Sequence, residues 1–327
     1  MFVKTIGKAI LICLLIALWA IPAHSWGFYG HRKINQLAVY MLPPEMMVFY
    51  KPAIDYLSEH AVDPDKRRYA VNGEAPRHYI DLDHFGQFPW EMVPRRWADA
   101  VAKYGEDTLN TYGIVPWWVN TMYQRLVQAF KAKDAARILR LSAEIGHYIS
   151  DAHVPLHASS NHNGQHSNQH GIHGFWESRI PELFAEARYD FLIGRAQYIT
   201  RPDLYIWDRV LESGLAADSV LRLEAELNNR FSPDQKYAYE ERLGKMVRQY
   251  STAYTTAYEK MLNGMVERRM RQSIYAVASY WYTAWVDAGQ PSLKGLNSNP
   301  FTPADMAAMD SLNLMWQQGK ALGKICD

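Results

Sequence analysis

Seven histidines fall between His147 and His173, and the first and last of them each stand four residues before a carboxylate, Asp151 and Glu177. Residues four apart project from one face of a helix, so each pair can bind a single metal ion. One such pair is more often a surface ion pair than a metal site. Two pairs within about thirty residues of sequence favour metal binding.

His157 lies between the two pairs, just beyond Pro155, where a helix carrying the first pair must bend or end. The stretch therefore offers five candidate ligands. Imidazole nitrogens and carboxylate oxygens without thiolates are typical of a hydrolytic zinc site rather than a structural one. By contrast, His162, His166 and His170 lie among Gly, Asn and Gln, and we expect them to form a solvated polar loop.

Residues 60–68 and 77–84 hold three more histidines and four aspartates, interleaved with basic residues. Taken alone, these segments could equally be exposed turns with surface ion pairs. Aromatic pairs such as Trp117-Trp118 and Trp281 with Trp285 could stack nucleic-acid bases, but aromatic residues at helical spacing more often form core. We assign them to the core.

The amino terminus has the features of a secretory signal peptide. Lys4 and Lys8 precede an apolar run from Ala9 to Ile21, and small residues occupy the minus-three and minus-one positions of a cleavage site after Ser25. Such a peptide directs export to the periplasm or the medium, and its cleavage makes Trp26 the first residue. An uncleaved membrane-anchored scaffold is the alternative.

The predicted mature chain has one cysteine, Cys326, so it cannot form an intrachain disulfide in an oxidising compartment. It carries 33 Lys and Arg residues against 34 Asp and Glu residues. This balance gives no bulk electrostatic attraction for nucleic acid or anionic membrane, although a local basic patch is compatible with it.

Helical periodicity dominates the chain, and strand signals are scarce. We therefore expect an all-α fold with a single domain over 26–289, preceded by the signal peptide (1–25) and followed by an accessory tail (290–327) with one weak helix from Pro303 to Leu322. The other expected helices are Ile34 to Leu42, Asp107 to Lys131, Asp134 to Ile149, Asp218 to Asn229, Gln235 to Val266 and Glu267 to Ala288.

Taken together, these motifs resemble the trinuclear zinc phosphodiesterases. That superfamily joins the fungal-type single-strand-specific nucleases (S-one/P-one type) to bacterial zinc-dependent phospholipase C. The motifs cover nearly half of the mature chain in the family's order. The segments that carry the resemblance are Trp26 followed by His31, Asp63, His78-Tyr79-Ile80-Asp81, the run from His147 to His157, and His173-Gly-Phe-Trp-Glu177.

The resemblance implies a compact multi-helix domain and three Zn²⁺ ions. One ion would be bound by Asp63, His78 and His147, with Asp151 bridging to its neighbour. That neighbour would also be bound by the terminal amine and carbonyl of Trp26 and by His31. The remaining ion would be bound by His157, His173 and Glu177. Because a backbone amine can ligate only after cleavage, the precursor is expected to lack one ligand.

The resemblance also implies further roles. Asp63 would orient the attacking water as base, and a cation near the phosphate would stabilise developing charge. The family's nucleases place Arg three residues after this Asp, whereas here that position is Lys66, followed by Arg67. Lys lacks the bidentate fork of Arg, so either Lys66 or Arg67 could fill the cationic role. Tyr79 and Asp81 match positions where the nucleases stack and hydrogen-bond a base.

The expected function is phosphoester hydrolysis on single-stranded nucleic acid or nucleotides, with no protein partner. The short spacing from Trp26 to His31 resembles the nucleases. Glu177 at the last ligand position and the short gap from His157 to His173 instead resemble phospholipase C, the alternative with a phospholipid substrate. A third hypothesis is a non-catalytic zinc-binding protein, which needs no open coordination position.

Overall fold

Long helices dominate the chain, and a two-stranded hairpin is the only sheet among the described residues. The computed structural model describes residues 27–242, 245–319 and 321–322. The predicted signal peptide, Trp26 and Cys326 lie outside them. None of the described helices has both the length and the apolar character needed to cross a bilayer. The expectation of an all-α protein is confirmed.

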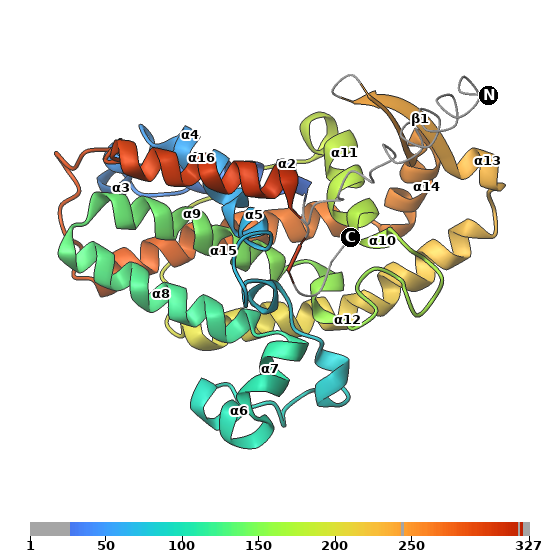
Figure 1. Ribbon diagram of the computed structural model, residues 1–327, viewed down its shortest axis with the longest axis horizontal. Helices are drawn as coiled ribbons and strands as arrows, with labels where there is room; N and C mark the ends of the chain where they lie inside the picture. The colour runs from blue at the N-terminus through green and yellow to red at the C-terminus, as the bar shows by residue number, and fades with distance from the viewer. Residues whose placement is uncertain (1–26, 243–244, 320, 323–327) are drawn as a thin grey trace, which may run out of the picture.

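The body of the protein is built from long helices that pack side by side (Figure 1). Helix α2 contacts α4 (Ile54–Glu59), α9 and α15, while α8 packs against α9, α12 and α15. Helix α9 thus lies at the centre and touches most of the others. The five longest helices of this body are α2 (Gly27–Val39), α8 (Val115–Ala132), α9 (Ala135–Asp151), α12 (Pro202–Asn228) and α15 (Met265–Asp287).

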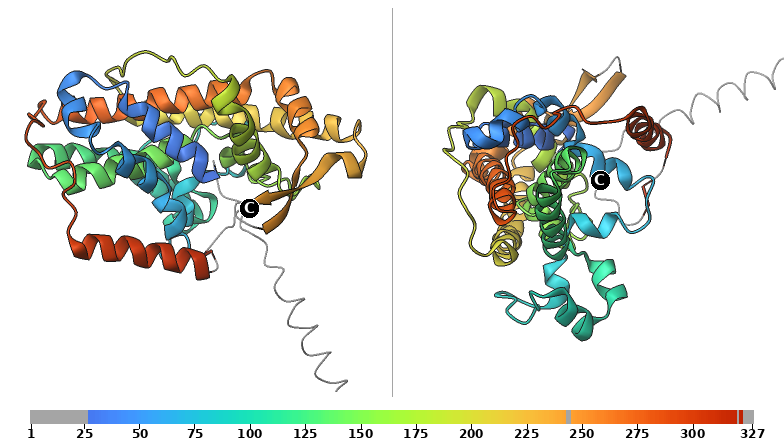
Figure 2. Two further views of the ribbon diagram at one scale, coloured as in Figure 1. Left: turned by 90° about the horizontal axis from the view of Figure 1, so that it is seen from above. Right: turned by 90° about the vertical axis from the view of Figure 1, so that its left-hand side faces the viewer.

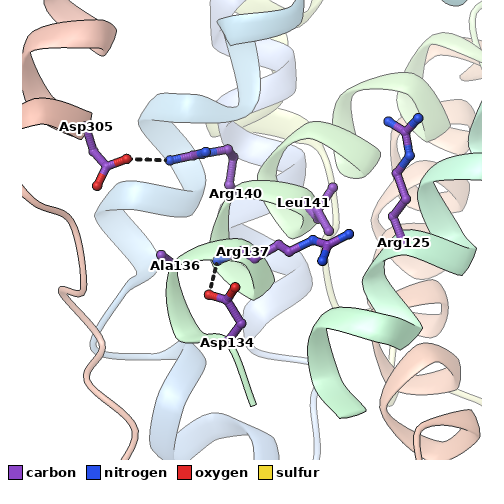
Figure 3. Close-up of a pocket in the computed structure, with 7 residues that line it drawn as sticks. All are labelled: Arg125, Asp134, Ala136, Arg137, Arg140, Leu141 and Asp305. Atoms are coloured by element: carbon purple, nitrogen blue, oxygen red, sulfur yellow. Dashed lines mark hydrogen bonds and ion pairs between the residues drawn. The ribbon is translucent and has the colours of Figure 1, made fainter. Parts of the chain in front are cut away.

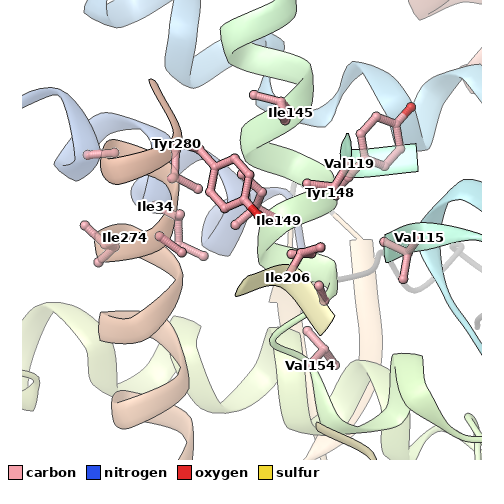
Figure 4. Close-up of a cluster of buried hydrophobic side chains, with 14 of the residues drawn as sticks. Ile34, Val115, Val119, Ile145, Tyr148, Ile149, Val154, Ile206, Ile274 and Tyr280 are labelled. Carbon is pink, nitrogen blue, oxygen red and sulfur yellow. The ribbon is translucent and has the colours of Figure 1, made fainter. Parts of the chain in front are cut away.

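Local signals set the boundaries of α9. Asp134 caps its first turn by accepting a hydrogen bond from the Arg137 amide. Just before it, Lys133 follows the last residue of α8 and adopts the left-handed conformation that ends that helix. The apolar stripe of α9 then packs into the core. Figure 4 shows Ile34 of α2, Ile149 of α9 and Ile274 of α15 meeting there. Burying each such side chain stabilises the fold by about 1.5–3 kcal/mol.

The predicted helix from Asp107 to Lys131 is divided in two at Gly113. Helix α7 (Glu106–Tyr112) ends there and α8 begins at Val115. Gly113 has φ +93°, and a Cβ at this position would overlap the Tyr79 backbone. A side chain is therefore excluded on both conformational and steric grounds. The close approach holds the 76–81 segment, because Ile114 donates to the Pro76 carbonyl and Asp81 donates to the Tyr112 carbonyl, both at 2.7 Å.

The prediction of one helix from Gln235 to Val266 is wrong. The segment instead forms an antiparallel hairpin of β1 (Tyr237–Arg242) and β2 (Lys245–Tyr250), then α14 (Thr252–Leu262). Tyr237 pairs with Tyr250 across the strands, and the Arg248 guanidinium lies 3.8 Å from the Tyr237 ring centroid. Cross-strand aromatic and cation–π contacts of this kind stabilise a hairpin and outweigh helix propensity here.

The ends of other helices also differ from the predicted ones. Helix α12 begins at Pro202, well before the predicted start at Asp218, because proline suits the first turn. The remaining elements are α3 (Pro44–Tyr50), η1 (His60–Val62), α5 (Asp63–Arg67), η2 (Ala75–His78), η3 (Leu82–Phe85), α6 (Trp97–Tyr104), η4 (Pro155–Ala158), α10 (Ile172–Gly174), η5 (Phe175–Arg179), α11 (Ile180–Arg188) and α13 (Pro233–Lys236).

The tail forms the expected helix, α16 (Pro303–Gln318), which lies on the outside of the helical body (Figure 2). It has no buried residue. Its contacts are peripheral: Asp305 pairs with Arg140 at 2.9 Å, and Phe301 stacks on Tyr56 with ring centroids 4.1 Å apart. Further along, the Leu322 amide donates to the Arg68 carbonyl. The helix therefore passes beside α5 without joining the core.

Candidate metal centre

Eight buried His, Asp and Glu side chains form three groups whose candidate ligand atoms lie within 4.8 Å of one another. Seven of the eight are predicted ligands, and Asp65 is the exception. The sequence separation between members reaches more than one hundred residues, so only the fold brings them together. The groups are His31, Asp65 and His147; His78, His147 and Asp151; and His157, His173 and Glu177.

Helix α9 carries the middle of this centre. His147 and Asp151 lie one turn apart, and His147 Nε2 is 3.2 Å from Asp151 Oδ2. The His31 ring of α2 stacks on the His147 ring with centroids 3.8 Å apart. Gly146 permits this approach, because a Cβ there would overlap Asn35 of α2. The α2–α9 contact therefore places His31 against the α9 ligands.

The third group follows the end of α9. Pro155 opens η4, and this short turn carries His157. His157 Nε2 lies 3.5 Å from Glu177 Oε2, and His173 Nε2 lies 3.1 Å from Glu177 Oε1. Glu177 sits in η5, a single π-helical turn, a conformation often found at functional sites. Asp151 Oδ1 is 3.8 Å from His157 Nε2, so the third group adjoins the others.

The spacing of these atoms fits a shared metal ion. Two ligands bound tetrahedrally to zinc at ordinary bond lengths lie roughly 3.4 Å apart. His31 Nε2 is 3.4 Å from Asp151 Oδ1, and His147 Nε2 is 3.6 Å from Asp65 Oδ1. Among the described residues, His31 Nε2, Asp151 Oδ1 and His157 Nε2 are fully buried without a hydrogen-bond partner. A metal ion would satisfy such atoms, which are otherwise costly to bury.

Outer hydrogen bonds from Nδ1 turn the other ring nitrogen of three histidines toward the centre. His147 Nδ1 donates to the Ala61 carbonyl at 2.8 Å, and His157 Nδ1 donates to the His78 carbonyl at 2.6 Å. His173 Nδ1 donates to the His162 carbonyl at 3.1 Å. A carbonyl can only accept, so each ring donates from Nδ1 and directs its Nε2 toward the centre. Metal-binding histidines are oriented by outer hydrogen bonds of this kind.

His31 and His78 are oriented differently. The Ser150 hydroxyl donates to backbone carbonyls of its own helix, so it accepts from His31 Nδ1 at 2.9 Å. His78 presents Nδ1 to the centre, 3.0 Å from Asp151 Oδ2, and turns Nε2 toward Glu74 Oε1 at 3.7 Å. Neither Ser150 nor Glu74 is predicted from the sequence, although Glu74 stands four residues before His78, a spacing that would have indicated it.

The protonation states also suit cation binding. Burial, with His147 alongside, lowers the pKa of His31 to about 3, so His31 is neutral. Burial disfavours the charged Asp151 carboxylate, but His147 and His157 outweigh it and hold the Asp151 pKa well below its usual range. Burial likewise opposes charge on His147, yet Asp151 and Asp65 raise its pKa to about 9. The centre therefore attracts positive charge.

The structure brings Asp65, rather than the predicted Asp63, into the centre. Asp63 is held outside it by His60 Nδ1 at 2.6 Å and Lys66 Nζ at 2.9 Å. Asp65 Oδ1 instead lies within 3.7 Å of His78 and His147. Both aspartates sit on the short helix α5, whose helical turn points them in different directions. Residue type alone cannot separate two carboxylates two positions apart.

Because Asp65 replaces Asp63 in the centre, a different basic residue has the spacing expected of the phosphate-binding cation. Arg68 stands three residues after Asp65, which is the spacing that the family resemblance implies for the phosphate-binding arginine. Lys66 is paired with Asp63, and Arg67 is paired with Glu144 at 2.8 Å. Arg68 is buried.

Tyr79 and Asp81, predicted to bind a base, are both buried. The Tyr79 hydroxyl donates to the Thr111 carbonyl at 3.2 Å, and the Asp81 amide donates to α7. The structure thus places them where the 76–81 segment is anchored. The predicted polar loop is partly confirmed, because His166 and His170 are exposed, whereas His162 is buried against the third group.

Comparison of the chain with protein-family models and with curated proteins finds no match. The structure agrees with the resemblance in two general features, the helical fold and the buried candidate metal ligands. It shows a helical protein with buried His, Asp and Glu groups that could hold metal ions.

Proposed function

We propose that this protein is a zinc-dependent phosphoester hydrolase that acts on single-stranded nucleic acid or nucleotides. The observation that carries the proposal is the geometry of the centre: eight buried ligands without thiolate, whose histidines are oriented by outer hydrogen bonds. Imidazole and carboxylate ligands favour zinc in hydrolytic sites. Three adjoining groups suit three ions. Bound zinc would lower the pKa of a coordinated water toward neutrality and neutralise phosphate oxygens.

The chain's own residues would supply the remaining functions. Asp151 faces His31, His147 and His157, so its two oxygens can be shared between neighbouring ions. Asp65, on α5, is the carboxylate proposed to orient water, since its side chain is the least buried of the three carboxylates in the centre. Arg68 is the proposed cation for the phosphate, with a planar fork suited to two oxygens.

We also propose that the protein is exported after cleavage following Ser25 and that Trp26 then completes the group containing His31. In support, α2 begins at Gly27, directly after Trp26, and runs to His31 one turn later. A terminal amine at residue 26 would therefore start within reach of the centre. The precursor would lack this ligand, so processing and activity would be coupled.

Phospholipase C is the second candidate. Glu177, rather than aspartate, occupies the last ligand position, and this feature resembles the phospholipases. The buried carboxylate lies between His157 and His173 and is an integral member of the third group.

The test uses the full chain, exported and processed in a bacterial host. Zinc is counted by elemental analysis, the amino terminus is sequenced, and hydrolysis of single-stranded DNA, a 3′-nucleotide and phosphatidylcholine is followed in parallel. We expect about three zinc ions per chain and cleavage of the nucleotide substrates, abolished by chelation and restored by zinc. Cleavage of phosphatidylcholine alone would establish the phospholipase. Bound zinc without turnover on any substrate would contradict the enzyme proposal and favour a binding protein.

A further inference from the structure

The helices α8 and α9 carry a local excess of positive charge. From the start of α8 to the end of α9 the chain has five Lys and Arg residues and three acidic residues. Of the acidic residues, Asp151 is buried in the metal centre and Glu144 pairs with Arg67, so the excess lies between Arg125 and Arg140, where Asp134 is the one acidic residue. The charges are exposed on the surface. An excess of this kind attracts polyanions and leaves the core unaffected. The five residues are Arg125, Lys131, Lys133, Arg137 and Arg140.

Three of these arginines line a surface pocket of about 490 Å³ between α8, α9 and α16. Figure 3 shows the Arg137 side chain extending toward α8, which carries Arg125, while Arg140 extends the other way to Asp305. The Asp134 carboxylate is used as the helix cap. Among the described residues, neither Arg125 nor Arg137 forms an ion pair with a carboxylate. Two guanidinium groups that line the pocket therefore remain available to anions.

The pocket is connected to the metal centre by a line of arginine and aromatic side chains. Arg125 lies over the Trp118 ring at 5.0 Å, and Arg77 lies over the same ring at 4.0 Å. Arg77 immediately precedes His78. Trp118 also contacts Tyr148, whose ring packs against His78 with centroids 5.3 Å apart. Arginine planes and aromatic rings are the groups on which unpaired bases stack. Tyr148 is fully buried, so within this line the accessible groups are the partly exposed Trp118 and the two arginines.

We propose that the arginine pocket, formed by Arg125, Arg137 and Arg140, binds a backbone phosphate of a single-stranded polynucleotide whose scissile phosphate lies at the metal centre. This inference rests on the proposed function and specifies its substrate as a polymer. Arg137 precedes His147 by ten residues on α9, which places the two sites roughly 15 Å apart along the helix axis. A mononucleotide or a lipid head group is too short to reach both. Asp305 reduces the positive charge of the pocket because it forms an ion pair with Arg140.

The experiment compares the processed holoenzyme with Arg125→Gln/Arg137→Gln. A matched control, Arg195→Gln/Arg230→Gln, removes two equally exposed charges elsewhere. Steady-state kinetics are measured on a 20-nucleotide oligothymidylate and on a 3′-mononucleotide over a range of salt. We expect the KM for the oligonucleotide to rise about 5- to 20-fold and the salt slope of log kcat/KM to shrink by about 1.4, the value for two phosphate contacts on a single strand. Mononucleotide kinetics stay within about twofold of the wild type, because its single phosphate does not reach the pocket.

The opposite change gives a second readout. Asp305→Asn removes the negative wall of the pocket and releases Arg140, so the KM for the oligonucleotide should fall about two- to threefold. Equal losses on both substrates, or no change on the oligonucleotide, would overturn the inference. If the wild type hydrolyses neither substrate, fluorescence anisotropy of labelled oligothymidylate tests binding to the pocket independently of catalysis. Weakened binding by the double variant retains the inference while the proposed function fails, and tighter binding to phosphatidylserine vesicles than to oligonucleotide would overturn it.

Discussion

The two halves of α9 differ in character. The carboxyl-terminal half buries His147 and Asp151, whose polar atoms are surrounded by other ligands and shielded from water. The amino-terminal half exposes Arg137 and Arg140 to solvent. In the buried half every atom depends on precise neighbours, because burial without a partner is costly. At the exposed charged residues of the amino-terminal half, unlike its buried Ile138 and Leu139, water and salt can replace any contact. Substitutions should therefore have large effects at the buried polar residues and small effects at the exposed charged ones.

The largest effect is expected for Asp151→Asn. The Asp151 carboxylate faces four histidines of the three groups, so its charge is required at every proposed ion. Activity should fall more than about 100-fold, since even outer-shell partners of a metal contribute 10- to 100-fold. Elemental analysis should show at least one ion lost per chain. Full zinc content with normal turnover would remove Asp151 from the centre.

A paired comparison of Asp65→Asn and Asp63→Asn tests which carboxylate belongs to the centre. Asp65→Asn removes the negative charge of a carboxylate whose Oδ1 lies 3.6 Å from His147 Nε2, so zinc content and activity should both fall, by roughly 10- to 100-fold in turnover. Asp63→Asn breaks the ion pairs to His60 and Lys66 but no ligand contact. Its activity should stay within about tenfold of the wild type. The reverse order would show that Asp63 is the ligand.

Gly146→Ala probes the packing that holds the buried half in place. The added methyl group overlaps the Asn35 side chain and forces α2 away from α9. Overpacking of this kind costs about 1–3 kcal/mol, measured as a lower midpoint of urea unfolding. Zinc affinity should fall as well, because α2 carries His31. In a double-mutant cycle, Asn35→Ala should recover part of the loss. Purely additive effects would place the strain elsewhere.

The smallest effect is expected for the surface pair of Arg140 and Asp305. Both side chains are partly exposed, and their ion pair at 2.9 Å ties α16 to α9. Arg140→Gln should lower the free energy of unfolding by less than about 1 kcal/mol, and less at high salt. Urea titrations at low and high salt measure this directly. A loss as large as that of Gly146→Ala would show that α16 is part of the cooperative core.

Much of this protein follows from local sequence. Helical periodicity predicts the all-α fold, and Asp134 and Pro155 mark the ends of α9. The four-residue spacing of His147 with Asp151, and of His173 with Glu177, predicts two pairs that the structure confirms as close neighbours. These features depend on backbone hydrogen bonds and on residues within one or two turns, so short segments contain the required information.

Other features are decided only by the tertiary structure. The orientation of α5 selects Asp65 over Asp63, and a cross-strand contact such as Arg248 on Tyr237 turns a predicted helix into a hairpin. Ser150 of α9 orients His31 of α2 from outside the centre, and the pocket lies between Arg125 of α8 and Arg137 of α9. Both features depend on helices that meet in space. The free energy of such contacts comes from partners far apart in sequence, and no local pattern specifies which side chains the packed helices will bring together.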